Sequence, residues 1–264
     1  MGNIVEFQFL RPRAMTARRD AVPAAYIGLG ILEWHGLQNP LGLDGVKANG
    51  VARHLAERLG GVVMPPQYWG DFRAPYADVE FDGNFQPDFS YPENHFDHTP
   101  FICEYMGITR ETYLKDTERS RQYGEWDIWE KLMVRTLFEI ETYGFKAIIL
   151  LPGHFHLIAA SDRAMERYYQ EGGQSKVLNL NEFAFTKEDL VGDHAAAFET
   201  SLMMSLCPEL VDMNELDSDL SKPNIGVIGL DPRVHASKEF GDRILDEYLL
   251  FASAFLKENG IIKP

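Results

Sequence analysis

The stretch GLGILEWHGLQNPLGLDGVKA, residues 28–48, decides the fold of this chain. A hydrophobic run over residues 25–32 leads into Glu33 and His35, and Asp44 follows where a helical pattern begins. Alternate residues of an extended backbone point the same way, so we expect Glu33 and His35 on one side of a strand end. Two carboxylates and an imidazole that converge there form a metal-binding set. These three residues also fit a simple strand end with a glycine-rich turn and solvated polar side chains.

The sequence on the carboxyl side of this stretch predicts a β-α-β unit. Apolar residues recur at near-helical spacing between residues 45 and 59, and Gly60 and Gly61 are expected to end the helix. The apolar residues 62–64, before two prolines, then predict a second strand. Such units place parallel strands in one sheet through a right-handed crossover.

The remaining periodicity continues the same alternation of strands and helices. Residues 145–151 (FKAIILL) form an almost continuous apolar run, which predicts a buried strand. We expect further helices at 126–143, after residue 156 to about 170, within 193–207 and at 240–258. Further strands are expected at 177–180 and at 225–230, where the second is a strand or a hairpin arm. The sequence therefore predicts an α/β fold, a single domain over 1–264 with a mainly parallel β-sheet flanked by helices.

Composition excludes several classes of partner. The net charge of −15 argues against nucleic acid and against an anionic membrane surface. The two cysteines are too few for a disulfide framework or a cysteine zinc site. The first residues are broken by arginines and a proline, so we expect neither a membrane span nor a signal peptide there, and a cytoplasmic location.

Three ordered blocks of the sequence resemble a known family. LEWHGLQNPLGLD at 32–44 is similar to the E-x-H-G…G-x-D signature of the creatininase (creatinine amidohydrolase) family. LLPGHFHLIAA at 150–160 and GDHAAAFETSLMMSLCPELVD at 192–212 resemble its other two blocks. The resemblance implies a creatininase-like fold and a metal-dependent amidohydrolase that acts on a small amide or cyclic amide, a non-peptide or small peptide-like C–N bond.

The resemblance also implies a ligand set for one or two divalent ions of Zn, Mn or Fe. Asp44 would bridge two ions, Glu33 and His154 would complete the first, and His35 would serve the second. Creatininase proper has a glutamate two residues after the block's histidine, where this chain has His156. Imidazole is a competent ligand for these metals. Both His156 and Glu199 remain candidates for the second ion.

Such a site suits hydrolysis by a metal-activated hydroxide. Bound divalent ions lower the pKa of water and polarise the carbonyl that hydroxide attacks. His194 matches the family's proton-transfer histidine, and an imidazole titrates in a useful range for that step. We count Glu199 as a second catalytic candidate. Asp193 and His194 also fit the start of a helix, where aspartate is favoured as a cap.

Creatinine itself is not the expected substrate. Creatininase encloses its substrate with tryptophans between the second and third blocks, whereas residues 157–192 contain none here. We expect Trp69, Phe155 and Asp193 to contact a different small amide. A non-catalytic metal- or metabolite-binding protein that kept the fold is the alternative. A third hypothesis is an interaction protein that needs no metal.

The segment from about 67 to 129 diverges from the family pattern and is rich in aromatic residues. Prolines break any long helix up to Cys103, so we expect a long loop or insertion. Such a segment is either a lid with aromatic walls over the substrate, with Trp69, Trp126 and Trp129 at its ends, or an oligomer contact. His95 and His98 within it are expected to be surface groups. The family resemblance also implies a homo-oligomer, possibly a hexamer.

Overall fold

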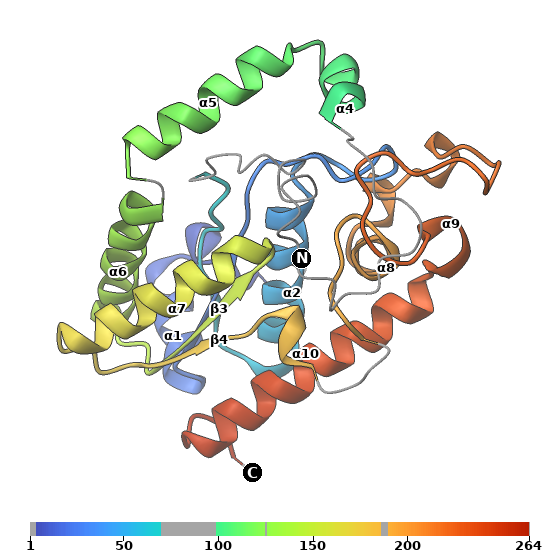
Figure 1. Cartoon of the computed structure of the whole chain (residues 1–264). Helices are drawn as coiled ribbons and strands as arrows, with labels where there is room; N and C mark the ends of the chain where they lie inside the picture. Colours follow the sequence, from blue (N-terminus) through green and yellow to red (C-terminus); the bar gives the residue numbers. More distant parts are fainter. Residues whose placement is uncertain (1–3, 70–98, 125, 186–189, 264) are drawn as a thin grey trace.

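A four-stranded parallel sheet forms the centre of the molecule (Figure 1). The computed structural model describes residues 4–69, 99–124, 126–185 and 190–263. Along the sheet the strands follow the order β2-β1-β3-β4, and every neighbouring pair is parallel. The strand bounds are β1 Ala24–Leu29, β2 Val62–Val63, β3 Ala147–Pro152 and β4 Lys176–Asn179. The predicted α/β fold with a parallel sheet is confirmed.

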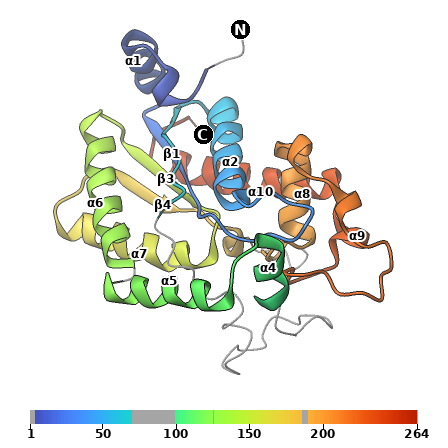
Figure 2. The ribbon, with the colours of Figure 1, turned by 90° about the horizontal axis from the view of Figure 1, so that it is seen from above.

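Helices cover the sheet on both faces (Figure 2). One face carries α6 and α7, and the other carries α2, α8 and α10. The helix bounds are α1 Pro12–Ala21, α2 Leu43–Leu59, α6 Trp126–Thr142, α7 Phe155–Gln170, α8 Ala197–Leu206, α9 Pro232–His235 and α10 Lys238–Glu258. Short 3-10 turns occupy Phe7–Phe9, Glu182–Ala184, Pro208–Leu210 and Met213–Glu215. In the described part of the chain, no helix is long and apolar enough to span a membrane.

The two central strands divide their side chains between two hydrophobic clusters. Tyr26 and Ile149 belong to the cluster under α2, α8 and α10, whereas Ile27 and Leu150 belong to the cluster under α6 and α7. This division follows from the two-residue period of a strand. Because both faces are covered, all six residues of β1 and of β3 are buried. That burial explains their nearly continuous apolar sequence.

Two sequence expectations are wrong. Residues 225–230 form no strand; Ile228 makes only an isolated antiparallel bridge with His194. The expected long loop is also partly helical, because α4 Thr99–Met106 and α5 Arg110–Gln122 follow one another in it. Pro100 occupies the first turn of α4, where its missing N–H costs no hydrogen bond. His95 and His98 lie outside the described residues.

Close backbone packing fixes the start of α2 against the ends of β1 and β3. A Cβ atom at Gly30 would lie 2.1 Å from the backbone nitrogen of Gly45, and one at Gly153 would lie 2.2 Å from the carbonyl oxygen of Asp44. Only glycine allows such an approach. The first turn of α2, with Asp44, therefore lies directly against both strand ends.

Candidate metal centre

The predicted ligands come from four segments that meet beyond the carboxyl ends of the sheet. Glu33 and His35 lie in the loop after β1, and His154 is the residue before α7, two positions after β3. Asp44 lies in the first turn of α2, and Glu199 in the first turn of α8. Strand β1 ends at Leu29. The expectation that Glu33 and His35 alternate at the strand end itself is therefore wrong, although the loop brings both side chains to the same place.

Glu33, Asp44 and His154 form a first donor group. The Nδ1 atom of His154 lies 3.0 Å from Oε2 of Glu33 and 3.4 Å from Oδ2 of Asp44. Both carboxylate oxygens are buried, and apart from the His154 imidazole they have no hydrogen-bond partner among the described residues. Buried oxygens without partners are costly, so the group favours a bound cation over an empty space.

His35, Asp44 and Glu199 form a second donor group. The Nε2 atom of His35 lies 2.9 Å from Oδ1 of Asp44 and 3.7 Å from Oε2 of Glu199. The Nδ1 atom of His35 is 3.2 Å from the carbonyl oxygen of Glu33, which can only accept, so Nδ1 carries the proton. That tautomer leaves Nε2, a buried atom without a hydrogen bond, free to ligate. Asp44 therefore presents one oxygen to each donor group.

Each donor group fits a divalent transition metal. Within either group the donor atoms lie within 4.8 Å of one another. Mixed imidazole and carboxylate ligands suit zinc, manganese or iron. The buried atoms without partners, Glu33 Oε2, Asp44 Oδ2 and His35 Nε2, are the observation that carries this assignment.

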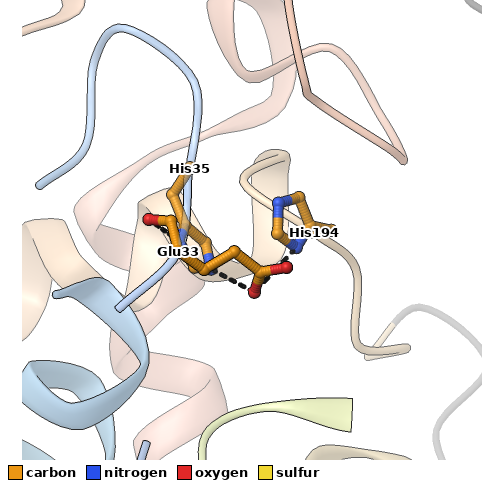
Figure 3. Close-up of side chains that lie close together, drawn as sticks. All are labelled: Glu33, His35 and His194. Carbon is orange, nitrogen blue, oxygen red and sulfur yellow. Dashed lines mark hydrogen bonds and ion pairs between the residues drawn. The ribbon is translucent and has the colours of Figure 1, made fainter. Parts of the chain in front are cut away.

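His194 also belongs to this cluster and lies beside Glu33 and His35 (Figure 3). Its Nε2 atom lies 2.9 Å from the carbonyl oxygen of Trp34, so Nε2 donates and Nδ1 is left as a base. Nδ1 faces Oε2 of Glu33 at 4.0 Å, and the ring stacks on His35 with centroids 4.4 Å apart. Glu33, His35 and His194 thus form a further possible ligand group.

Charges in the centre shift the pKa values of its histidines in opposite directions. Burial lowers the pKa of His35, but Asp44 and Glu199 outweigh burial and raise it to about 9. Burial and the neighbouring His35 both hold the pKa of His194 below its usual range. Glu33 keeps a lowered pKa despite burial because His154 and His194 stabilise its anion. Among the protein groups alone, His194 is therefore the neutral base of the cluster.

Comparison with known proteins shows similarity to one family. Residues 125–249 match the family model Creatininase, creatinine amidohydrolase. This part of the chain is therefore similar to a creatininase domain. It is 26% identical to creatinine amidohydrolase from Pseudomonas putida over 206 residues, which are 71% of this chain and 66% of that relative, just under two thirds of its length. The predicted resemblance to the creatininase family is confirmed.

Solved creatininase structures share the fold over nearly the whole chain. A mutant creatininase of the Zn-Zn type has a TM-score of 0.62 at 20% identity, and a creatininase with Mn has a TM-score of 0.63 at 19% identity. Each alignment covers 97% of this chain and 98% of the other. At these identities the match shows the fold alone.

His156 lies behind the first donor group, next to His154. Its Nδ1 atom is 3.0 Å from Nε2 of His154, the ring nitrogen that faces away from Glu33. Within the described residues His156 joins none of the possible ligand groups, whereas Glu199 does. The contact is typical of an outer partner that orients a ligating imidazole. Burial and His154 lower the pKa of His156 to about 4, so it accepts this bond as a neutral ring.

The predicted substrate residues occupy three different environments. Asp193 accepts hydrogen bonds from the backbone N–H groups of Phe198 (2.7 Å) and Glu199 (3.1 Å), so it caps α8 from three residues before the helix cap. Phe155 is 59% exposed in the first turn of α7, beside the ring of His156. Trp69 is 77% exposed.

Two tryptophans expected at the ends of an aromatic lid are core residues instead. Trp129 is buried in the cluster under α6 and α7, and Trp126 packs against that cluster. Their rings meet edge to face at 6.0 Å. The helical period of α6 turns both indoles toward the sheet, so they do not provide a substrate wall.

Sequence reasoning missed Lys47 and Glu182. The ammonium of Lys47 donates to Oε2 of Glu182 at 2.9 Å and to Oε1 of Glu199, and all three side chains are buried. Burial opposes the charge of Lys47, but Glu182 and Glu199 outweigh burial and raise its pKa. A signal was present, because Lys47 stands three positions after Asp44 on the buried face of α2.

Proposed function

We propose that this protein is a metal-dependent amidohydrolase that cleaves a small amide or cyclic amide C–N bond. The observation that carries the proposal is Asp44, whose two oxygens serve two groups of buried donors beyond the carboxyl ends of β1 and β3. Sites of open α/β sheets form at that edge. The match of residues 125–249 to the Creatininase family model and the relative named creatinine amidohydrolase support the same reaction class.

The two donor groups would hold divalent ions of Zn, Mn or Fe, one or two per chain. Glu33, Asp44 and His154 would bind the first ion, and His35, Asp44 and Glu199 the second. Bound there, a divalent ion supplies Lewis acidity, which makes water a stronger nucleophile and polarises a substrate carbonyl. The Zn-Zn and Mn forms of related creatininases support these metals.

His194 would move the proton. Its Nε2–H is held by the carbonyl of Trp34, so the neutral ring presents Nδ1 toward Glu33 and the cluster. Nδ1 would take a proton from the attacking water and deliver it to the leaving nitrogen, which must be protonated to depart as an amine. Stacking on His35 and the hydrogen bond to Trp34 fix the orientation of the ring for this transfer.

The substrate proposed is not creatinine. Residues 157–192 contain no tryptophan, and Trp126 and Trp129, the candidates for a replacement wall, pack in or against the core. Trp69 and Phe155 are the exposed aromatic residues that we propose for substrate contact. We further propose a cytoplasmic homo-oligomer, with a hexamer as the candidate assembly; the acidic chain and its resemblance to creatininases support this proposal.

The test measures metal content and turnover in the same variants. Asp44→Ala removes a ligand of both ions, so we expect it to lose most bound metal by elemental analysis. Turnover of a panel of lactams, formamides and short peptides should fall with it. The matched control is Asp127→Ala, because Asp127 is an exposed aspartate paired only locally with Lys131. Full metal content in Asp44→Ala would contradict the metal assignment.

The same panel distinguishes an enzyme from a binding protein. Metal-loaded protein that turns over none of the compounds, yet binds one of them, would favour the non-catalytic alternative. Efficient hydrolysis of creatinine would contradict the substrate proposal and leave the reaction class in place.

A further inference from the structure

A strained turn leads into α8. Ala195, which follows His194, has a φ of 55°, the only positive φ of a non-glycine residue in the described part of the chain. An L residue is strained there because its Cβ crowds the backbone carbonyl, whereas glycine has no Cβ to crowd it. Ala195 is also fully buried. Such a conformation persists only where its surroundings hold it, and residues of this kind gather at functional sites.

Hydrogen bonds hold the turn on both sides of Ala195. Its N–H donates to Oε2 of Glu199 at 2.6 Å. Its carbonyl accepts from Nε2 of Gln38 at 2.7 Å and from the hydroxyl of Thr200 at 3.2 Å. The two contacts to the carbonyl oppose the strain, because relaxation of φ would break hydrogen bonds in a buried setting.

Gln38 reaches the turn from the loop after β1, 157 positions earlier in the chain. Its side chain is buried, and its backbone carbonyl accepts from the N–H of Asp212 at 3.0 Å, so the residue is itself anchored. A carbonyl can only accept, so the amide nitrogen of Gln38 is the atom that faces the turn.

The loop after β1 therefore holds His194 in two ways. The carbonyl of Trp34 accepts from the imidazole at 2.9 Å, and Gln38 holds the residue that follows His194. On the other side of the chain, the backbone of His194 exchanges hydrogen bonds of 2.9 and 2.8 Å with Ile228. The conformation of Ala195 thus decides how the chain leaves His194 and enters α8.

We propose that Gln38 is a positioning residue that clamps Ala195 in its left-handed conformation and thereby keeps His194 aimed at the cluster. The role of His194 rests on the function proposed above, whereas the clamp is a property of the folded chain alone. Without the amide donor, the carbonyl of Ala195 loses the shorter of its two hydrogen bonds, and φ relaxes toward an ordinary value. The imidazole then shifts, and a misplacement of about 1 Å costs roughly a hundredfold in rate.

A double-mutant cycle between positions 38 and 195 tests the clamp. Gln38→Met keeps the approximate volume of the side chain and removes its donor. Ala195→Gly removes the strain, because glycine adopts positive φ readily, so a chain with this change needs no clamp. The loss in the folding equilibrium constant caused by Gln38→Met should therefore be at least roughly threefold smaller when Ala195→Gly is also present. Urea denaturation measures this without metal or substrate.

Turnover of the substrate found in the compound panel tests the positioning. Gln38→Met should lower kcat by roughly tenfold to a hundredfold and leave KM within about twofold, because Gln38 is buried and makes none of the proposed substrate contacts. In the presence of Ala195→Gly, the same substitution should lower kcat by less than about threefold. A side chain that only fills space would show no such rescue.

Two controls match the two substitutions. Gln170→Met makes the same exchange at an exposed glutamine of α7 and should change neither stability nor kcat. Ala236→Gly places glycine where φ is −76°, an ordinary value, and should not rescue Gln38→Met. If Gln38→Met does not fold, Gln38→Asn, whose amide is one methylene shorter, takes its place in the cycle.

The outcomes separate this inference from the proposed function. Equal effects of Gln38→Met with and without Ala195→Gly, on unfolding and on kcat, would overturn the inference and leave the function standing. Coupled unfolding with an unchanged kcat would overturn the positioning role. A wild type that turns over no compound would contradict the function, while the urea cycle would still decide the clamp.

Discussion

The interior of the sheet and the centre of the cluster beyond its carboxyl edge are both buried but opposite in chemistry. Ile149 and Leu150 on β3 are 0% exposed, and so is His35; Asp44 is 1% exposed. In the sheet, removal of water stabilises the fold, because apolar area is transferred out of solvent at about 25 cal/mol per Å². Beyond the edge, the same removal of water destabilises charged groups unless they find partners.

The comparison shows that burial by itself does not identify what a region contributes. The aliphatic side chains of β3, such as Ile149 and Leu150, fill space and carry no polar atoms, whereas Glu33, His35 and Asp44 keep donor atoms without hydrogen bonds. Natural proteins retain such costly groups mainly where they bind or react. Substitutions in the core should therefore change stability, whereas substitutions in the cluster should change metal content or turnover.

The largest effect is expected from His194→Ala. Loss of a proton-transfer imidazole should lower kcat/KM on the identified substrate by roughly a hundredfold to ten-thousandfold. Bound metal should change little, because the two donor groups that share Asp44 remain complete. Steady-state kinetics and elemental analysis check the two statements. His54→Ala on α2, outside the cluster, is the control, and equal losses in both variants would contradict the role of His194.

Truncation of a core side chain should instead lower stability and leave metal binding unchanged. Leu150→Ala leaves a cavity between the sheet and the helices α6 and α7, and we expect the free energy of unfolding to fall by about 2–5 kcal/mol. Urea denaturation measures this change, and Leu132→Ala at a position 54% exposed should stay within about 0.5 kcal/mol. A large loss of metal affinity in folded Leu150→Ala would break the separation of the two regions.

Removal of metal by a chelator should lower stability by a smaller amount. A ligand that binds only the folded state at a hundredfold excess over its Kd contributes about 2.7 kcal/mol. The thermal midpoint should therefore rise with free Zn²⁺ in the wild type but hardly in Asp44→Ala. An unchanged midpoint in the wild type across that titration would contradict a folded-state metal site.

The smallest effect is expected from Trp69, an exposed aromatic residue proposed for substrate contact. Trp69→Ala should reduce kcat/KM by less than about tenfold, since a single exposed contact is worth roughly 1 kcal/mol. Metal content should not change. Tyr123→Ala, at an aromatic residue that is 73% exposed near the end of α5, is the matched control. Equal turnover in wild type and Trp69→Ala would remove Trp69 from the substrate site.

The local pattern of apolar residues was sufficient to predict the main helices and strands of the fold. The expected helix at 126–143 is α6 Trp126–Thr142, and the apolar run at 145–151 overlaps β3 Ala147–Pro152 in all but its last residue. These elements are decided by the period of their apolar residues, which neighbours along the chain already specify. The same reasoning failed at 225–230, where an apolar stretch has no strand to pair with and makes one bridge to His194.

The sequence by itself determined that Glu33, His35, Asp44 and His154 follow the ends of buried strands or begin helices, because periodicity and chain order specify those positions. Only the tertiary structure decided that Asp44 divides its oxygens between two groups and that Lys47 engages Glu199. Lys47 and Glu199 are 152 positions apart. Contacts of that range depend on how α2 and α8 pack together, which no local pattern encodes.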